Sequence, residues 1–400
     1  MFRSRVPKIL IISSDTGGGH RSAAAAIVTG VQKFFHGQSY AVRVVRAVEE
    51  SHHLSAKLVG IYNWLLQNKQ HWMKYFYWVI NRVRPETREF FHRRCIGFVR
   101  EQFERWCPHV VVSVHPLTQH IFARVIKELG LTDVIPLVTV VTDPGYGFWK
   151  GWACDDVKLY LVASEEARQQ LLDYGVLAER IKISGMPIDP KFQVSTDIAA
   201  QAARRALGLD PDKFTVFVNA GWLGGGNIPD IFRELVRGEL DVQAIFLAGK
   251  NSDLQAEADQ IAKTARFPIK VIGYSDQVEQ LMGAANVMIS KLGGLTTFEA
   301  LACHLPIIAD VTTPPMPQEA GTAAMLSKRG AGILLERAED IVPVIRHMVT
   351  DTAHYAEMRA ATIGMTVPNS TKFIVEQIAA LIPDRLTADD EAREPESQVA

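Results

Sequence analysis

Several features that would assign this sequence to a common functional class are missing. The four cysteines lie far apart and form no C-x-x-C pair, which argues against a zinc ribbon, an iron–sulfur site or a disulfide framework and favours a reducing compartment. No apolar stretch reaches the ~18 residues that cross a membrane. The N-terminal apolar run is too short for a signal peptide. With a formal net charge of -1, the chain has no overall field that would attract nucleic acid.

An α/β pattern runs through the 400 residues and occurs twice, which fits two domains. Apolar runs typical of strands buried on both faces alternate with amphipathic helical segments, so we expect parallel sheets of βαβ units. Residues 8–13, 41–45, 109–114, 135–142 and 157–164 are the strands expected in the first half. Residues 214–220, 242–249, 269–273, 286–290 and 306–310 are those expected in the second half.

The pattern also suggests where the domains begin and end. We expect an N-terminal domain over residues 1–190 and a C-terminal domain over 191–368, joined near two prolines that interrupt regular structure. A final amphipathic helix over 369–383 is expected to pack back on the N-terminal domain. Residues 384–400 carry six acidic and two basic residues and are expected to form a disordered tail.

A glycine-rich turn follows the first expected strand. Gly18 and Gly19 let backbone N–H groups approach a ligand at a helix N-terminus, where phosphate binds well. The turn is neither a G-x-G-x-x-G fingerprint, which argues against an NAD-dependent dehydrogenase, nor a Walker loop. His20 is either a general base at the strand ends or a helix residue without chemistry. Asp15 either orients His20 or caps the turn.

Further candidates for ligand binding lie in the second half. Two more glycine turns follow expected strands, and each could meet a phosphate. Glu299 lies one turn into the next helix, where a carboxylate can accept ribose hydroxyls. Gln318 and Glu319 either bind sugar hydroxyls or cap a helix. We expect no metal, because no Asp-x-Asp pair stands at a strand end. The glycine-turn candidates are Gly224, Gly225, Lys291, Gly293 and Gly294.

An aromatic and basic stretch lies between residues 52 and 100. It holds nine Lys or Arg, two acidic residues, and ten of the 34 aromatic residues. This composition is typical of amphipathic helices that lie in the lipid headgroup layer. The alternative is a helical hairpin whose aromatic rings fill a core. Nucleic-acid binding is disfavoured, because no basic stripe continues elsewhere. The candidate membrane and acceptor residues are Trp64, Trp72, Lys74, Trp78, Arg82 and, further on, Trp149.

Several motifs together resemble one family of glycolipid-forming enzymes. They are SDTGGGHRSAAAAI, HPLTQ, VTVVTD, GMPIDPKF, NAGWLGGG, AGKN, SKLGGLTTFEALACHLPII and PQEAG. The resemblance spans nearly the whole chain, from about residue 8 to residue 382. The sequence resembles the monogalactosyldiacylglycerol synthase and processive diacylglycerol glucosyltransferase family. It is more distantly similar to the peptidoglycan N-acetylglucosaminyltransferase that acts on an undecaprenyl-linked acceptor.

The resemblance implies a GT-B fold, in which two Rossmann-like, doubly wound domains face each other across a cleft. It implies an inverting transfer of a hexose from UDP-galactose or UDP-glucose to diacylglycerol. The enzyme would be peripheral, at the cytoplasmic face of an anionic membrane, with the UDP-sugar as substrate and no cofactor. His20 falls on the family's base, and Glu299 on its ribose carboxylate. The KxGG turn at Lys291 and the turn at Gly224 would flank the diphosphate. Gln318 and Glu319 fall on the pair that contacts the sugar.

The sequence departs from the family pattern at two places. The histidine that commonly follows the TD motif is missing after Asp143, and Trp149 and Trp152 occupy that region. Thr322 stands where an asparagine is common after QEAG. Other interpretations are a transferase for a polyprenyl-linked acceptor, a UDP-N-acetylglucosamine epimerase, and a non-catalytic scaffold that binds UDP-sugar or lipid. Retention of His20, Glu299, Gln318 and Glu319 argues against the scaffold.

Overall fold

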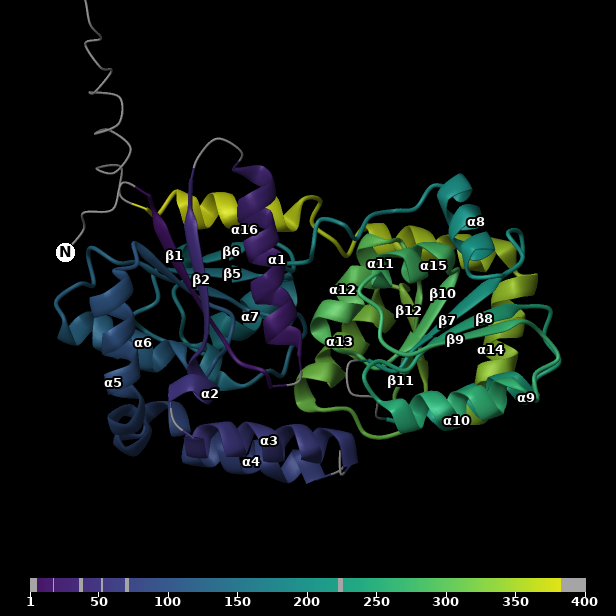
Figure 1. Ribbon diagram of the computed structural model, residues 1–400, viewed down its shortest axis with the longest axis horizontal. Helices are drawn as coiled ribbons and strands as arrows, with labels where there is room; N and C mark the ends of the chain where they lie inside the picture. Colours follow the sequence, from purple (N-terminus) through teal and green to yellow (C-terminus); the bar gives the residue numbers. More distant parts are fainter. Residues whose placement is uncertain are drawn as a thin grey trace, which may run out of the picture.

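Two six-stranded parallel sheets, each flanked by helices, lie side by side in the computed structural model (Figure 1). The structure describes residues 6–16, 18–35, 39–51, 53–68, 72–221 and 226–382, so the expected tail lies outside the described residues. The first sheet has the order β2-β1-β3-β4-β5-β6, and the second has the order β12-β11-β10-β7-β8-β9. The predicted α/β class with two doubly wound sheets is confirmed.

The first sheet and its helices occupy the N-terminal half. Strands β1, β3, β4 and β5 are mainly apolar and, apart from Lys8 at the start of β1, buried on both faces, as helices on both sides of a parallel sheet require. The elements are β1 (Lys8–Ser13), α1 (Gly19–Phe34), β2 (Ala41–Arg46), α2 (Ala47–Ser51), α3 (His53–Asn68), α4 (Met73–Val83), η2 (Pro85–Thr87), α5 (Glu89–Trp106), β3 (Val110–Ser113), α6 (Gln119–Glu128), β4 (Leu137–Val140), η3 (Lys150–Trp152), β5 (Leu159–Val162), α7 (Glu165–Asp173), η4 (Ala178–Arg180) and β6 (Ile181–Ile183).

The second sheet is built in the same way. Its four inner strands, β11, β10, β7 and β8, are fully buried. The elements are α8 (Asp197–Ala206), β7 (Thr215–Asn219), α9 (Ile228–Arg237), β8 (Gln243–Leu247), α10 (Ser252–Ala262), β9 (Ile269–Ile272), α11 (Val278–Ala284), β10 (Val287–Ser290), α12 (Gly294–Ala302), β11 (Ile307–Asp310), α13 (Pro317–Lys328), β12 (Gly332–Leu335), η5 (Ala338–Asp340), α14 (Ile341–Thr350), α15 (Thr352–Ile363) and α16 (Ser370–Ala379).

Two strands were not expected from the sequence. β6 and β12 are short, lie at the edges of their sheets, and are only partly buried. In β6 a lysine separates the two isoleucines, so no continuous apolar run marks the strand, whereas β12 has the apolar sequence Gly-Ile-Leu-Leu and was missed because it is only four residues long. Hydrophobic patterning therefore indicated five strands in each half where the structure has six.

The last helix, α16, lies beside α1 of the first half (Figure 1). The Ser370 and Thr371 hydroxyls donate hydrogen bonds to the carbonyls of Met186 and Ile188, at 2.6 and 2.5 Å. Gly30 of α1 leaves room for this contact, because a Cβ there would come within 2.6 Å of the Thr371 methyl. The chain thus returns from the second sheet to close against the first.

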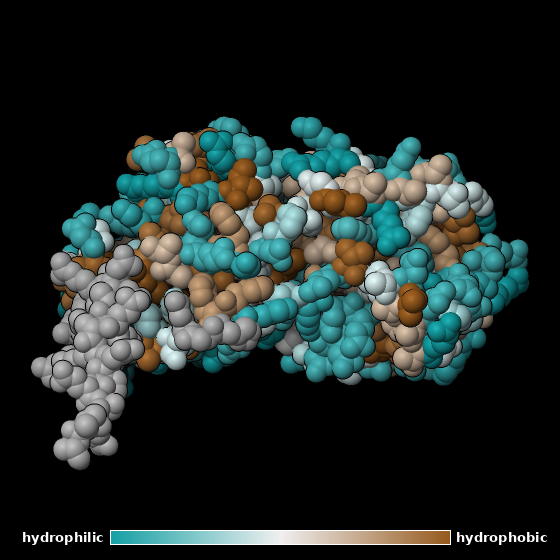
Figure 2. All heavy atoms as spheres, turned by 90° about the horizontal axis from the view of Figure 1, so that it is seen from above, coloured by the Kyte–Doolittle hydropathy of each residue, from teal (hydrophilic) through white to brown (hydrophobic). Residues whose placement is uncertain are grey.

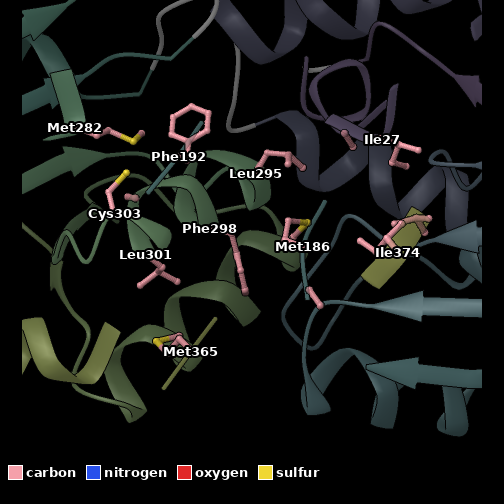
Figure 3. Close-up of a cluster of buried hydrophobic side chains, with 14 of the residues drawn as sticks. Ile27, Met186, Phe192, Met282, Leu295, Phe298, Leu301, Cys303, Met365 and Ile374 are labelled. Atoms are coloured by element: carbon pink, nitrogen blue, oxygen red, sulfur yellow. The ribbon is translucent and has the colours of Figure 1, made fainter. Parts of the chain in front are cut away.

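A continuous apolar cluster connects the two halves beneath the cleft. Figure 3 shows Met186 between Ile27 and Ile374 on one side and Leu295 and Phe298 on the other. Burial of such side chains contributes roughly 1.5–3 kcal/mol each. This shared core fixes α1 against α12, and with them the two walls of the cleft.

Helices α3 and α4 form a hairpin on the side of the molecule away from α16 (Figure 1). Figure 2 shows the opposite face, which carries α16, with hydrophilic and hydrophobic residues interspersed. No helix among the described residues is both long and apolar enough to cross a membrane.

Candidate active site

His20 stands at the start of α1, directly after the glycine turn that follows β1. The turn needs glycine at position 18, because its φ of 84° is left-handed. The imidazole Nδ1 lies 2.7 Å from the carbonyl oxygen of Val114 and 3.1 Å from the Thr142 hydroxyl. A carbonyl can only accept, so Nδ1 carries the proton and Nε2 the lone pair. Burial lowers the pKa of His20 to about 4, which leaves the ring neutral at pH 7.

Asp15 does not contact this imidazole among the described residues. Its carboxylate pairs with Arg46 at 3.3 Å, and its backbone N–H donates to Glu49 at 2.8 Å. The reason is the register of the sheet, which places Arg46 at the end of β2 beside the end of β1. The predicted orienting role of Asp15 is therefore wrong for this structure, and Val114 and Thr142 orient the imidazole instead.

One cavity of 280 Å³ brings most of the predicted donor-binding residues to the same place as His20. It lies between the first turn of α1 and the first turns of α12 and α13. The N-termini of three helices therefore point into one space, which favours a negatively charged ligand. Gly224 and Gly225 lie outside the described residues. Those predicted residues that line the cavity are Gly18, Gly19, His20, Lys291, Gly293, Gly294, Glu299, Gln318 and Glu319.

Three charged side chains that line this cavity, those of Lys291, Glu299 and Glu319, are at least partly buried and have pKa values shifted from their usual ranges. Burial raises the pKa of Glu299 to about 7. Burial also raises the pKa of Glu319, and it lowers the pKa of Lys291, an effect that Glu319 and Asp310 oppose. Shifted pKa values of ionisable groups in a cleft are typical of functional sites. Glu319 also accepts the backbone N–H of Met316 at 3.1 Å, so the helix-capping alternative is realised for this residue.

A second cavity, of 330 Å³, opens on the other side of His20 and is largely apolar. Among the described residues that line it, Asp143 is the only carboxylate and none is Lys or Arg. Five residues line both cavities and so mark the point where they meet: Thr16, His20, Tyr62, Asp143 and Gln318. The remaining described lining includes Val59, Phe76, Val79, Ile80, Val83, Ile121, His115 and Trp149.

Helix α4 forms one wall of this second cavity, and three of the predicted membrane residues on or near the α3–α4 hairpin are exposed tryptophans. Trp78 is 64% exposed, and Trp64 of α3 and Trp72 are 53% and 56% exposed. The alternative that these indoles fill a core is therefore wrong. Arg82 is exposed as well, whereas the side chain of Lys74 lies outside the described residues. Tyr62 and Phe76 face inward, with ring centroids 5.3 Å apart.

Asp143 and His115 belong to this site but were given no role from the sequence. Both follow strands that end at the cleft, and they lie in the VTVVTD and HPLTQ motifs. The His115 ring meets that of His20 edge-on, with centroids 4.7 Å apart. Asp143 Oδ2 accepts the indole N–H of Trp152 at 2.7 Å, and burial raises its pKa to about 6. Their placement at the carboxyl ends of β3 and β4 was the available signal.

The structure shows what surrounds the two positions that depart from the family pattern, the region of Trp149 and Thr322. Trp149 lines the apolar cavity, in the region where the usual histidine is missing. Thr322 is buried, and its hydroxyl donates to the carbonyl of Gln318 within the same helix at 3.1 Å.

No group of three or more His, Cys, Asp or Glu side chains in the described part of the chain could hold a metal ion.

Comparisons with known proteins agree with this geometry. Residues 20–188 match the family described as monogalactosyldiacylglycerol (MGDG) synthase, and residues 227–374 match the glycosyltransferase family 28 C-terminal domain. The MGDG synthase of Spinacia oleracea is 29% identical, over 95% of this chain and 73% of the relative. A processive diacylglycerol beta-glucosyltransferase of Bacillus licheniformis is 25% identical, over 92% and 94%.

Solved structures show the same fold at low sequence identity. Acinetobacter baumannii MurG superimposes with a TM-score of 0.61 at 13% identity, covering 94% of this chain and 99% of that one. A UDP-GlcNAc 2-epimerase from Neisseria meningitidis, bound to UDP-GlcNAc, gives a TM-score of 0.58 at 12% identity over 93% and 100%. The family resemblance and the GT-B fold predicted from the sequence are confirmed.

Proposed function

We propose that this chain, a glycosyltransferase whose two halves match the MGDG synthase and the family 28 C-terminal models, transfers a hexose from a UDP-sugar to diacylglycerol. The hexose is galactose or glucose, in line with the names of relatives of both kinds. The observation that carries the proposal is the meeting of a polar and an apolar cavity at His20.

The apolar cavity favours diacylglycerol over a polyprenyl diphosphate acceptor. A diphosphate buried beside the attacking hydroxyl needs cationic partners. The described lining of this cavity has no Lys or Arg, and its one carboxylate, Asp143, would repel the phosphates. Diacylglycerol carries only ester groups and a hydroxyl, and its chains match the aliphatic wall formed by Val79, Ile80 and Val83.

The donor fits the polar cavity. The diphosphate would lie against Lys291, Gly293 and Gly294 at the start of α12, and the ribose hydroxyls would bind Glu299. Gln318 and Glu319 would contact the hexose, with its anomeric carbon facing His20. Helix N-termini and Lys291 would stabilise the charge that develops on the departing UDP.

His20 is the proposed base in this reaction. Nδ1–H is fixed on the Val114 carbonyl, so the Nε2 lone pair is available to take the proton of the acceptor hydroxyl. The oxygen then bonds to the anomeric carbon on the side opposite UDP, which inverts the configuration there. Because the ring is neutral at pH 7, it needs no prior deprotonation.

The proposed function is tested by supplying diacylglycerol in anionic vesicles together with UDP-galactose or UDP-glucose, and reading the lipid products by mass spectrometry. We expect monohexosyldiacylglycerol from one of the two donors. An undecaprenyl diphosphate-linked sugar serves as the competing acceptor and is expected to give no product. Transfer to that acceptor alone, or UDP binding without any transfer, would contradict the proposal.

Replacing Glu299 with glutamine is expected to weaken UDP binding by roughly tenfold or more, because a hydrogen bond to a charged group is lost. The wild-type affinity should rise between pH 6 and pH 8, since burial raises the pKa of Glu299 to about 7 and the ionised form accepts the ribose hydroxyls. Calorimetric titration at both pH values measures the affinity for UDP.

The change of affinity with pH that Glu299 causes should be absent in Glu299→Gln. The control variant Glu257→Gln, on the exposed face of α10, should behave as wild type. Equal affinities for all three proteins would exclude the ribose contact.

The exposed tryptophans of the α3–α4 hairpin would place the mouth of the apolar cavity at the membrane surface. Changing Trp72 and Trp78 together to serine is expected to reduce binding to anionic vesicles roughly tenfold, because two indoles are lost from the interface. Sedimentation with vesicles measures the bound fraction. The matched control is Ile198→Ser, since Ile198 is 79% exposed on α8 of the other domain. Undiminished vesicle binding by the double variant would mean that another surface docks.

A further inference from the structure

The junction between the two cavities holds a carboxyl group that has no role in the reaction proposed above. Of the five residues shared by both cavities, only His20, Tyr62 and Asp143 have titratable side chains, and only Asp143 has a carboxyl group. It lies at the carboxyl end of β4, three residues after Val140.

Asp143 and His20 are held by common neighbours. Thr142, next to Asp143 in the chain, lies 3.1 Å from His20 Nδ1 through its hydroxyl. Trp152 donates its indole N–H to Asp143 Oδ2 at 2.7 Å, and its ring centroid lies 6.1 Å from that of His20. One oxygen of the carboxyl group is thereby fixed, and the group is kept at the cleft.

The two groups differ in how well each can hold a proton. Burial keeps the pKa of His20 at about 4, so an imidazolium formed there at neutral pH is unstable and must release its proton. Burial has the opposite effect on an acid and raises the pKa of Asp143 to about 6. Proton transfer from the imidazolium to the Asp143 carboxylate is therefore favourable.

We propose that Asp143 is the final acceptor of the proton that the lipid hydroxyl releases, an inference that rests on the proposed function. The O–H bond of diacylglycerol breaks as its oxygen bonds to the anomeric carbon. The bond from that carbon to the diphosphate breaks, and its electron pair leaves with UDP. The proton passes through Nε2 of His20 to the carboxylate of Asp143, which becomes a neutral acid until solvent enters.

Other titratable groups face the same space and have to be separated from Asp143 in any test. Besides His20 and Asp143, the titratable side chains that line the two cavities are Arg21, Tyr62, Cys95 and His115 in the first half of the chain and Lys291, Glu299 and Glu319 in the second half. The groups that bind the donor are removed from the pH dependence by working at saturating UDP-sugar. Of the groups that do not bind the donor, Asp143 is the only one with a carboxyl group.

The test is the pH profile of kcat/KM for diacylglycerol, measured at saturating UDP-sugar between pH 5 and pH 8. We expect the wild-type value to fall tenfold per pH unit below about pH 6, where Asp143 becomes protonated. Asp143→Asn still accepts the Trp152 N–H and should keep the wild-type melting temperature. Its kcat/KM should be about 10²-fold lower at pH 8 and level across the range.

Asp155→Asn is the matched control, because Asp155 lies on the same loop and is exposed. It should reproduce the wild-type profile. A wild-type rate in Asp143→Asn overturns the proton-acceptor role. A reduced rate that still falls below about pH 6 overturns it as well, because Asp143 would then be only a positioning residue. A wild-type enzyme that forms no glycolipid at any pH instead overturns the proposed function, and the relay with it.

Discussion

Replacing His20 with alanine is expected to lower turnover by about 10²–10⁴-fold, the range that general-base catalysis contributes. Nε2 is the one imidazole nitrogen left for the acceptor hydroxyl, since Nδ1 is engaged by Val114. Steady-state assays with diacylglycerol vesicles measure the loss. Calorimetry should show UDP bound as tightly as in wild type, because the proposed diphosphate and ribose contacts, Lys291 and Glu299, lie in the second half of the chain.

The matched control is His347→Ala, since this histidine is exposed on α14, away from both cavities. It should leave turnover unchanged. A His20→Ala enzyme that keeps full turnover would end the assignment of the base and leave Asp143 to act alone. Wild-type turnover should not follow the titration of His20 near neutral pH, because its pKa of about 4 keeps the ring neutral there.

The Gly321→Ala variant is expected to lose about 10²-fold in turnover, by holding the cleft open. A Cβ on Gly321 would lie 1.8 Å from the carbonyl oxygen of Tyr146, and one on Gly145 would lie 2.3 Å from the Gly321 carbonyl carbon. The loop after β4 and the start of α13 thus touch backbone to backbone. A displacement of about 1 Å between Asp143 on one side and Gln318 on the other is enough for a loss of this size.

Turnover and melting temperature together measure this effect. Gly364→Ala is the control, because its φ of −70° suits alanine and the nearest atom to a Cβ lies 3.9 Å away. It should match wild type in both. Full turnover in Gly321→Ala would show that the two loops separate during the reaction. The contact also gives the glycine of the QEAG motif a steric reason, distinct from the sugar contacts proposed for the residues before it.

The sequence was sufficient to predict those site residues whose positions depend on the local pattern of strand, glycine turn and helix. A glycine turn between a buried strand and a helix places His20 at the strand ends whatever the rest of the chain does, and the same holds for Lys291 at the start of α12. Strand β6 escaped notice because an edge strand of three residues has no continuous apolar signal.

The remainder depends on contacts between distant segments. Asp143 is an ordinary acid in the sequence, and its burial arises only when Trp152 folds over it. Asp15 looked equally suited to orienting His20, but the parallel pairing of β1 with β2 brings Arg46 to its carboxylate. Arg46 lies 31 residues from Asp15, and Trp152 lies nine residues after Asp143 in a loop whose course no regular pattern predicts, so spacing alone could not predict either pairing.

A crystal structure with UDP-galactose or UDP-glucose would test most directly whether one cleft serves both substrates. We expect the diphosphate at Lys291 and Gly294, the ribose at Glu299, and the anomeric carbon facing His20 Nε2 at the mouth of the apolar cavity. A nucleotide bound elsewhere, or a hexose turned away from His20, would contradict the proposed transfer.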